Sequence, residues 1–178
     1  MKFIETKLKG AYIIEPDRLE DERGFFARTF CIKEFEDHGL DPKIVQCNIS
    51  YNKQKGTLRG MHYQAAPMAE AKLVSCTRGA IYDAIIDMRS ESSTYCQWLA
   101  EELNAENRNM MYVPEGFAHG FQTLEDDTEV FYQMSEFYSP EHARGVRWDD
   151  PAFGVKWPLN RKIISEKDDN YPFISKKK

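Results

Sequence analysis

Three side chains that could carry out acid–base or anion-binding chemistry lie close together in residues 57–76: Arg59, His62 and Lys72. In a regular strand, alternation would place His62 on the opposite face from Arg59. Gly60 between them would let another segment approach the backbone closely. A titratable ring beside two cations favours the wall of a pocket for an anionic polar ligand. The alternative is a core histidine with two surface cations, since buried titratable groups also serve structure.

The elements that must position these side chains read as short strands. Apolar segments recur at roughly ten-residue spacing, separated by Gly, Asp and Pro, which is typical of an all-β barrel or jelly roll. Turns are expected at Gly10 and Gly79, and a short helix is expected in CIKEFEDHGL, ending at Gly39. The segment 98–107 could be a strand or a short helix, and we predict a strand.

Composition narrows the class of protein. The 178 residues suggest one domain over 1–178, and a hydrophobic fraction of 42% is enough for one core. The net charge of -5 provides no basic field for nucleic acid. No apolar run is long enough to span a membrane, and the first residues lack a signal-peptide core. The four scattered cysteines are expected to be reduced thiols. These features predict a cytoplasmic protein.

The chain closely resembles the dTDP-4-dehydrorhamnose 3,5-epimerase family, whose members are cupin-like jelly rolls acting on nucleotide-linked 4-keto sugars. The resembling motifs follow the family's order along nearly the whole chain. They are ERGFF (22–26), Gln46-x-Asn48-x-Ser50, LRGMHYQ (58–64), KLV (72–74), RGAIYDAIIDMR (78–89), VPEGFAHGF (113–121), FYQMSEFYSP (131–140), WDDP (148–151) and SEKD (165–168). The resemblance implies an all-β, cupin-like jelly-roll barrel with a few short helices.

The family's reaction inverts carbons next to a ketone. It needs a base on one face, an electrophile at the developing enolate oxygen and an acid on the other face, with no cofactor or metal. The resemblance assigns the base to His62, oriented by Asp168, the acid to Tyr132 and enolate stabilisation to Lys72. Without the resemblance, Asp168 would belong to an acidic tail and Tyr132 to the core.

The resemblance also assigns side chains that hold the sugar nucleotide. Arginine suits the diphosphate because its planar fork binds phosphate oxygens bidentately. In the family the arginine that corresponds to Arg23 reaches the neighbouring subunit's site, so a homodimer is implied. Taken singly, several of these residues would be surface or packing residues. The assigned positions are Arg23, Arg28, Gln46, Asn48, Arg59, His119, Tyr138 and Lys167.

Two positions depart from the family's thymidine-binding pattern. Family members commonly carry glutamate where this chain has Arg28 and Ala143. A carboxylate can accept a hydrogen bond from thymine N3–H, whereas arginine only donates. One hypothesis is that the pocket is retuned for another nucleotide sugar, such as a CDP- or GDP-linked one. The alternative is that Arg28 points at a phosphate or at solvent and dTDP still binds.

Three rival functions remain open. A metal-dependent cupin would need a second histidine two positions after His62, where the chain has Gln64. A sugar-nucleotide binder without activity could share the same barrel, because a fold does not determine function. An epimerase acting at one centre, or a ketoisomerase, would stay within the family. The combination of His62, Tyr132 and Asp168 argues against a binder without activity, and His62 with Tyr132 favours epimerisation over ketoisomerisation. The simplest expectation is 3,5-epimerisation of dTDP-4-dehydro-6-deoxyglucose to dTDP-4-dehydrorhamnose.

Overall fold

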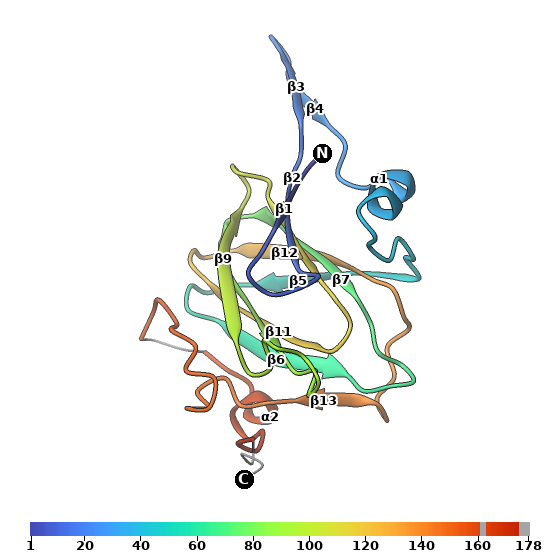
Figure 1. Cartoon of the computed structure of the whole chain (residues 1–178). Helices are drawn as coiled ribbons and strands as arrows, with labels where there is room; N and C mark the ends of the chain where they lie inside the picture. Colours follow the sequence, from blue (N-terminus) through green and yellow to red (C-terminus); the bar gives the residue numbers. More distant parts are fainter. Residues whose placement is uncertain (161–162, 175–178) are drawn as a thin grey trace.

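Two antiparallel sheets lie face to face and enclose the core (Figure 1). The computed structural model describes residues 1–160 and 163–174. One sheet runs β1 (Lys2–Glu5), β2 (Tyr12–Glu15), β10 (Met110–Val113), β7 (Lys72–Arg78), β12 (Thr128–Met134) and β5 (Gln46–Asn52). The other runs β13 (Ala143–Gly145), β6 (Leu58–Gln64), β11 (Phe117–Thr123), β8 (Ala80–Asp87) and β9 (Trp98–Asn104). This arrangement confirms the predicted all-β jelly roll.

The local predictions also hold. The turns at Gly10 and Gly79 have φ of 90° and 73°, values that glycine adopts without a steric penalty. The predicted helix is α1 (Ile32–Asp37), and Gly39 follows it with φ of 67°. The ambiguous segment is strand β9, paired along its length with β8. A second short helix, α2 (Glu166–Asp169), lies in the segment after residue 140 that is otherwise loop.

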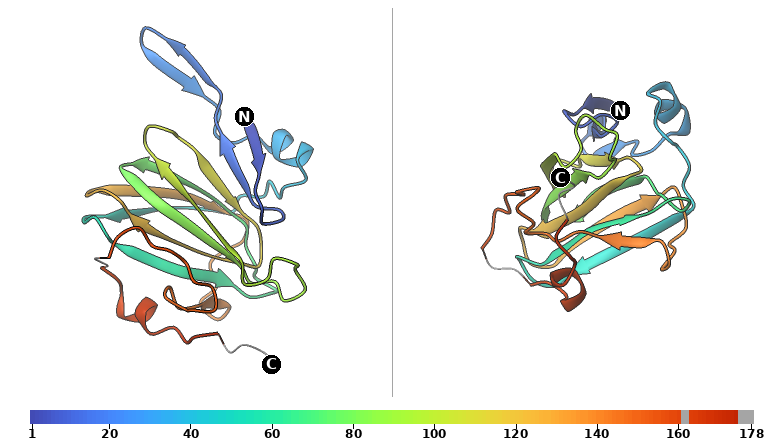
Figure 2. Two further views of the ribbon diagram at one scale, coloured as in Figure 1. Left: turned by 60° about the vertical axis from the view of Figure 1, so that its left-hand side comes forward. Right: turned by 60° about the horizontal axis from the view of Figure 1, so that its bottom comes forward.

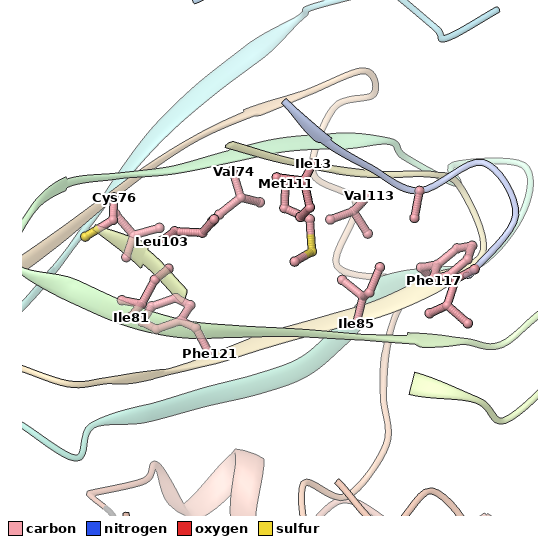
Figure 3. Close-up of a cluster of buried hydrophobic side chains, with 13 residues drawn as sticks. Ile13, Val74, Cys76, Ile81, Ile85, Leu103, Met111, Val113, Phe117 and Phe121 are labelled. Atoms are coloured by element: carbon pink, nitrogen blue, oxygen red, sulfur yellow. The ribbon is translucent and has the colours of Figure 1, made fainter. Parts of the chain in front are cut away.

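The core consists of apolar side chains that alternate inward from both sheets. Val74 and Met111 from the six-stranded sheet face Ile81, Ile85 and Phe121 from the five-stranded sheet (Figure 3). These residues are almost entirely removed from water. The packed core holds the two sheets at a fixed separation, so side chains on their inner faces can meet across the remaining space.

One hairpin stands apart from the sheets. Strands β3 (Arg18–Asp21) and β4 (Gly24–Ala27) pair only with each other among the described strands and extend away from the barrel (Figures 1 and 2). Leu19 and Phe26 on this hairpin are 69% and 72% exposed. Apolar side chains this open to water on a projecting arm are typical of a contact surface.

Neither described helix has the length and apolar character that crossing a bilayer requires. All four cysteines are free of disulfide partners.

Candidate active site

A cavity of about 470 Å³ opens between the inner faces of the two sheets. It takes side chains from both sheets and from the C-terminal segment. Most of the predicted site residues line it: Gln46, Asn48, Arg59, His62, Lys72, His119, Tyr132, Tyr138, Lys167 and Asp168. The volume suits a small organic ligand.

Strand register explains why residues far apart in the chain share this cavity. His62 of β6 lies directly opposite His119 of β11. In the facing sheet, Asn48 of β5 lies opposite Tyr132 of β12. Residues opposite each other in an antiparallel pair point to the same face. Each sheet therefore presents a matched pair of polar side chains to the interior.

The strict alternation predicted around His62 is wrong. Between the pairs His119–His62 and Phe121–Arg59, β11 advances by two residues and β6 by three. An extra residue in one strand is a β-bulge, and it reverses the alternation beyond it. Arg59 and His62 consequently line the same cavity. Gly60 lies in this bulge.

The close backbone approach predicted at Gly60 is confirmed. A Cβ added there would lie 2.6 Å from Cα of Gly120 on the neighbouring strand. No larger residue fits at this position without displacing one of the two strands. The glycine therefore allows the bulge to form against β11 and so helps to place Arg59 and His62 together.

His62 and Asp168 form a hydrogen-bonded pair. Nε2 of His62 lies 2.7 Å from Oδ1 of Asp168, and Oδ2 of the same carboxylate accepts the Gly60 N–H at 3.3 Å. Burial by itself would raise the pKa of Asp168, but the hydrogen bonds from His62 and Gly60 outweigh it and hold that pKa below its usual value. An ionised carboxylate only accepts, so Nε2 is the ring nitrogen that donates the hydrogen bond to Asp168.

Helix α2 brings Asp168 to this position. Ser165 caps the helix, and its Oγ accepts the backbone N–H of Asp168 at 3.1 Å. Asp168 is 5% exposed, whereas Glu166 and Lys167 beside it are exposed. The helix thus turns the Asp168 carboxylate towards β6 and leaves the Glu166 side chain in water.

Tyr132 and Lys72 lie on the opposite wall. Burial raises the pKa of Tyr132, and Arg59 only partly offsets this, so the phenol keeps its proton at neutral pH. Nζ of Lys72 lies 2.5 Å from Oε1 of Glu70, whose Oε2 accepts the Gln64 N–H at 3.0 Å. Glu70 therefore fixes the direction of the ammonium group.

His119 forms a second histidine–carboxylate pair. Its Nε2 lies 2.7 Å from Oδ1 of Asp83, which is fully buried on the neighbouring strand β8. The pair sets His119 beside His62 with its ring orientation fixed.

Other predicted residues line the outer part of the cavity. Nε of Arg59 donates to Oδ1 of Asn52 at 2.7 Å, and the backbone N–H of Tyr138 donates to Oε1 of Gln46 at 3.1 Å. Ala143, one of the two departures from the family pattern, also lies in the lining. Because alanine has a shorter side chain than glutamate, the cavity has more room at this position than it would have in a relative with glutamate there.

Two predicted residues do not line the cavity. Arg23 lies at the tip of the β3–β4 hairpin, where it pairs with Asp21 at 2.5 Å. Arg28 follows the same hairpin and pairs with Glu34 of α1 at 2.7 Å. Arg28 does not line this chain's own cavity, so it has no contact with a nucleotide base there through which the pocket could be retuned.

Sequence reasoning missed Glu70, Asp83 and Tyr171. Asp83 had a detectable signal, because it is a charged residue within the apolar strand sequence AIYDAIID. Glu70 lies two residues before Lys72, outside any strand. Nothing in the sequence indicated Tyr171, which lines the cavity beside His62.

No group of three or more His, Cys, Asp and Glu side chains in residues 1–160 and 163–174 has an arrangement that could hold a metal ion. Both cavity histidines are instead paired with single aspartates.

Comparison with known proteins gives a consistent result. Residues 5–176 match the family model described as dTDP-4-dehydrorhamnose 3,5-epimerase. An enzyme of that name from Methanothermobacter thermautotrophicus is 46% identical over 173 residues, which is 96% of this chain and 92% of the relative.

Solved structures agree in fold. The dTDP-4-dehydrorhamnose 3,5-epimerase of Bacillus anthracis, solved with TDP and PPi bound, is 42% identical with a TM-score of 0.94, covering 97% of this chain and 99% of that one. ChmJ, a 3'-monoepimerase from Streptomyces bikiniensis solved with dTDP-quinovose, is 31% identical with a TM-score of 0.89, covering 96% and 86%. The chain belongs to the dTDP-4-dehydrorhamnose 3,5-epimerase family and is an isomerase of that family.

Proposed function

We propose that this chain catalyses the 3,5-epimerisation of dTDP-4-dehydro-6-deoxyglucose to dTDP-4-dehydrorhamnose without a cofactor. The observation that carries the proposal is the placement of the titratable groups. The His62–Asp168 pair comes from the five-stranded sheet side, and Tyr132 and Lys72 come from the opposing six-stranded sheet. A sugar ring between these walls has a base on one face and an acid on the other, as inversion requires.

The proposed roles follow from the geometry. Nδ1 of His62 removes the proton beside the ketone, and Asp168 stabilises the imidazolium that forms. Lys72, directed by Glu70, stabilises the enolate oxygen. Tyr132 returns a proton from the other face, which is possible because its phenol stays protonated until the enolate forms.

The outer cavity is proposed to hold the nucleotide. Arg59 and Lys167 supply positive charge for the diphosphate, and Tyr138 offers an exposed aromatic face for the base. Gln46 and Asn48 provide amide groups along the same wall. Arg28 forms an ion pair with Glu34 outside the cavity, which supports the alternative that Arg28 does not contact the base and that dTDP still binds. We therefore take dTDP as the nucleotide in preference to CDP or GDP.

We propose a homodimer in which the β3–β4 hairpin of each subunit covers its partner. The hairpin exposes Leu19, Phe25 and Phe26 and carries Arg23 at its tip, outside its own cavity. Docking on a second copy would remove this apolar surface from water and bring Arg23 to the partner's diphosphate site. A single domain over residues 1–178 and a cytoplasmic location remain predictions.

The test is proton NMR of dTDP-4-keto-6-deoxyglucose with the enzyme in deuterated water. Deuterium should enter C3 and C5 and the rhamnose configuration should accumulate. Exchange at C3 alone would identify a single-centre epimerase, the activity that the name of ChmJ gives.

The same experiment with CDP- and GDP-linked sugars tests the nucleotide. A faster reaction with either would restore the retuned-pocket hypothesis. Absence of exchange with all three sugars, while dTDP still binds, would instead show a binding protein.

A further inference from the structure

The ring of Tyr171 packs against Gly145, the residue of β13 that is paired with His62 of β6. The segment after α2 passes over β13, and Gly145 of β13 is the register partner of His62 on β6. A Cβ added at Gly145 would lie 2.3 to 2.5 Å from three ring atoms of Tyr171. The aromatic ring therefore lies directly on the glycine backbone. From there it makes a T-shaped contact with the His62 ring, with the ring centroids 5.8 Å apart and the planes at 64°.

The segment that carries Asp168 needs such anchors. Helix α2 has four residues, too few for a helix to be stable by its own hydrogen bonds. Its attachments are side-chain contacts with the barrel and its neighbouring loop. One is the hydrogen bond from Nε1 of Trp148 to Oδ1 of Asp169, at 3.0 Å. Another is the seating of Tyr171 on Gly145, and Tyr171 also lines the cavity.

We propose that Tyr171 is a positioning residue for the His62–Asp168 pair. By packing its ring on Gly145, it keeps the Asp168 carboxylate within hydrogen-bond distance of His62. The inference rests on the proposed function of that pair as base and orienting carboxylate. With the ring in place, the chain that follows Asp168 is held at two points, by Asp169 at the end of α2 and by Tyr171 just beyond it. The ring also covers His62 from the side of β13.

The position of the Asp168 carboxylate determines which ring nitrogen of His62 carries the proton. The Asp168 carboxylate must stay within hydrogen-bond distance of Nε2 for the lone pair to remain on Nδ1. A shift of about 1 Å in a group that aligns the reaction can reduce the rate about a hundredfold. Of the proposed nucleotide contacts only Lys167 lies on α2, whereas Arg59 and Tyr138 lie outside it, so loss of Tyr171 should affect turnover more than binding.

Four variants test the proposal. Tyr171→Ala removes the ring, and Tyr171→Phe keeps it without the hydroxyl. Gly145→Ala places a methyl group where the Tyr171 ring packs, and the three atoms nearest to it are all ring atoms of Tyr171. The backbone of Gly145 lies outside the left-handed region, so alanine causes no backbone strain there. The double variant Gly145→Ala/Tyr171→Ala removes that obstacle.

The expected kinetic result is a fall in kcat of about tenfold or more for Tyr171→Ala and for Gly145→Ala, with KM within about twofold. Tyr171→Phe should retain kcat near that of the unaltered enzyme. The double variant should match Tyr171→Ala, because the two changes act on one contact. Wild-type kcat in Tyr171→Ala, or multiplying losses in the double variant, would overturn the proposal.

A second readout does not depend on turnover. The chain has four histidines, so the ring nitrogens of His62 can be assigned in 15N-labelled protein. In the unaltered enzyme Nε2 should carry the proton, and Tyr171→Ala should give a mixture of tautomers while dTDP binding and the melting temperature change little. An unchanged His62 spectrum would overturn the inference. If the unaltered chain shows this tautomer but no exchange into the sugar, the proposed function fails and the positioning role is still decided.

Discussion

At the scale of single residues, the two cavity histidines show how environment separates similar side chains. His62 and His119 are register partners, and each is paired with one aspartate at 2.7 Å. The side chains of His119 and Asp83 are both buried, at 10% and 0% exposure. The His62 side chain is 43% exposed. Substrate can therefore reach His62 far more readily than His119, which supports His62 as the base.

The Asp168→Asn variant should lose about a hundredfold or more in kcat. The amide keeps the shape of the side chain but loses the negative charge that stabilises imidazolium and selects the Nε2–H tautomer. The measurement is the rate of deuterium incorporation at C3 and C5. Glu166→Gln, on the exposed side of the same helix, is the control and should keep full activity. Similar rates for the two variants would remove Asp168 from the mechanism.

The Tyr132→Phe variant should separate the two proton transfers. Proton abstraction by His62 does not need the phenol, so exchange at the substrate should continue. Completed inversion should fall about a hundredfold, because the proton donor on the opposite wall is missing. Comparing deuterium uptake with the yield of inverted sugar measures the two steps separately. Unchanged inversion in this variant would show that another group supplies the proton.

At the scale of elements, the site depends on an irregularity in one strand. The bulge in β6 places Arg59 and His62 on one face, and it fits against β11 because Gly60 and Gly120 have no side chains. A regular strand would have directed one of the two functional side chains away from the cavity. The bulge therefore has a functional consequence as well as a structural one.

Gly60→Ala should reduce the free energy of unfolding by about 3 kcal/mol or more. The new methyl group meets Gly120 at 2.6 Å, and φ at this position is +137°. Gly39→Ala is the matched control, since φ there is +67° with nothing within 4 Å of the added Cβ. That variant carries only the backbone cost, about 1 kcal/mol. Urea unfolding of both proteins gives the comparison, and equal losses would show that the strands tolerate the contact.

A second element-level feature is the loop between β8 and β9, which is organised by Asp87. Its carboxylate accepts hydrogen bonds from the Arg89 side chain at 2.8 and 2.9 Å and from the hydroxyls of Ser92 and Thr94, each at 2.6 Å. Burial alone would raise the pKa of Asp87, but these bonds outweigh it and lower the pKa to about 2 from 3.8.

Asp87→Asn should therefore show a pH-dependent loss of stability. A lowered folded-state pKa means that Asp87 stabilises the fold above about pH 4, and that this contribution is lost as the pH falls through about 2. The variant should lose at most about 2 kcal/mol at neutral pH, with the difference shrinking in acid. Urea unfolding across this range measures it. The exposed Asp37→Asn is the control, and a difference that stays constant with pH would contradict the assignment.

At the scale of the whole molecule, the projecting hairpin β3–β4 carries apolar side chains that the described part of its own chain does not cover. Its apolar side chains are exposed, and Arg23 at its tip does not line the cavity of its own chain. Both observations have one explanation if a second copy covers the hairpin. The active site would then be built from two chains.

Mixing two inactive variants tests this arrangement. Arg23→Ala lacks the arginine and His62→Asn lacks the base. If Arg23 serves the partner's site, each mixed dimer has one complete site, and random exchange should restore about a quarter of the full activity. Each variant alone is the control, and light scattering gives the oligomeric state. No recovery in demonstrably mixed dimers would place Arg23 outside the partner's site.

The sequence alone was sufficient for several features of this protein. The short strands, the turns at Gly10 and Gly79 and helix α1 follow from propensities and alternation within a few neighbouring residues. The motif order identified the family, and with it His62 and Asp168 as partners across 106 positions of the chain.

Only the tertiary structure decided how these pieces meet. The bulge that brings Arg59 beside His62 and the pairing of Asp83 with His119 depend on register between strands. The seat of Tyr171 on Gly145 depends on how the segment after α2 packs on β13. Register is set by packing over the whole barrel, because shifting a strand by one residue moves its side chains to the other face. No local pattern in the sequence contains that information.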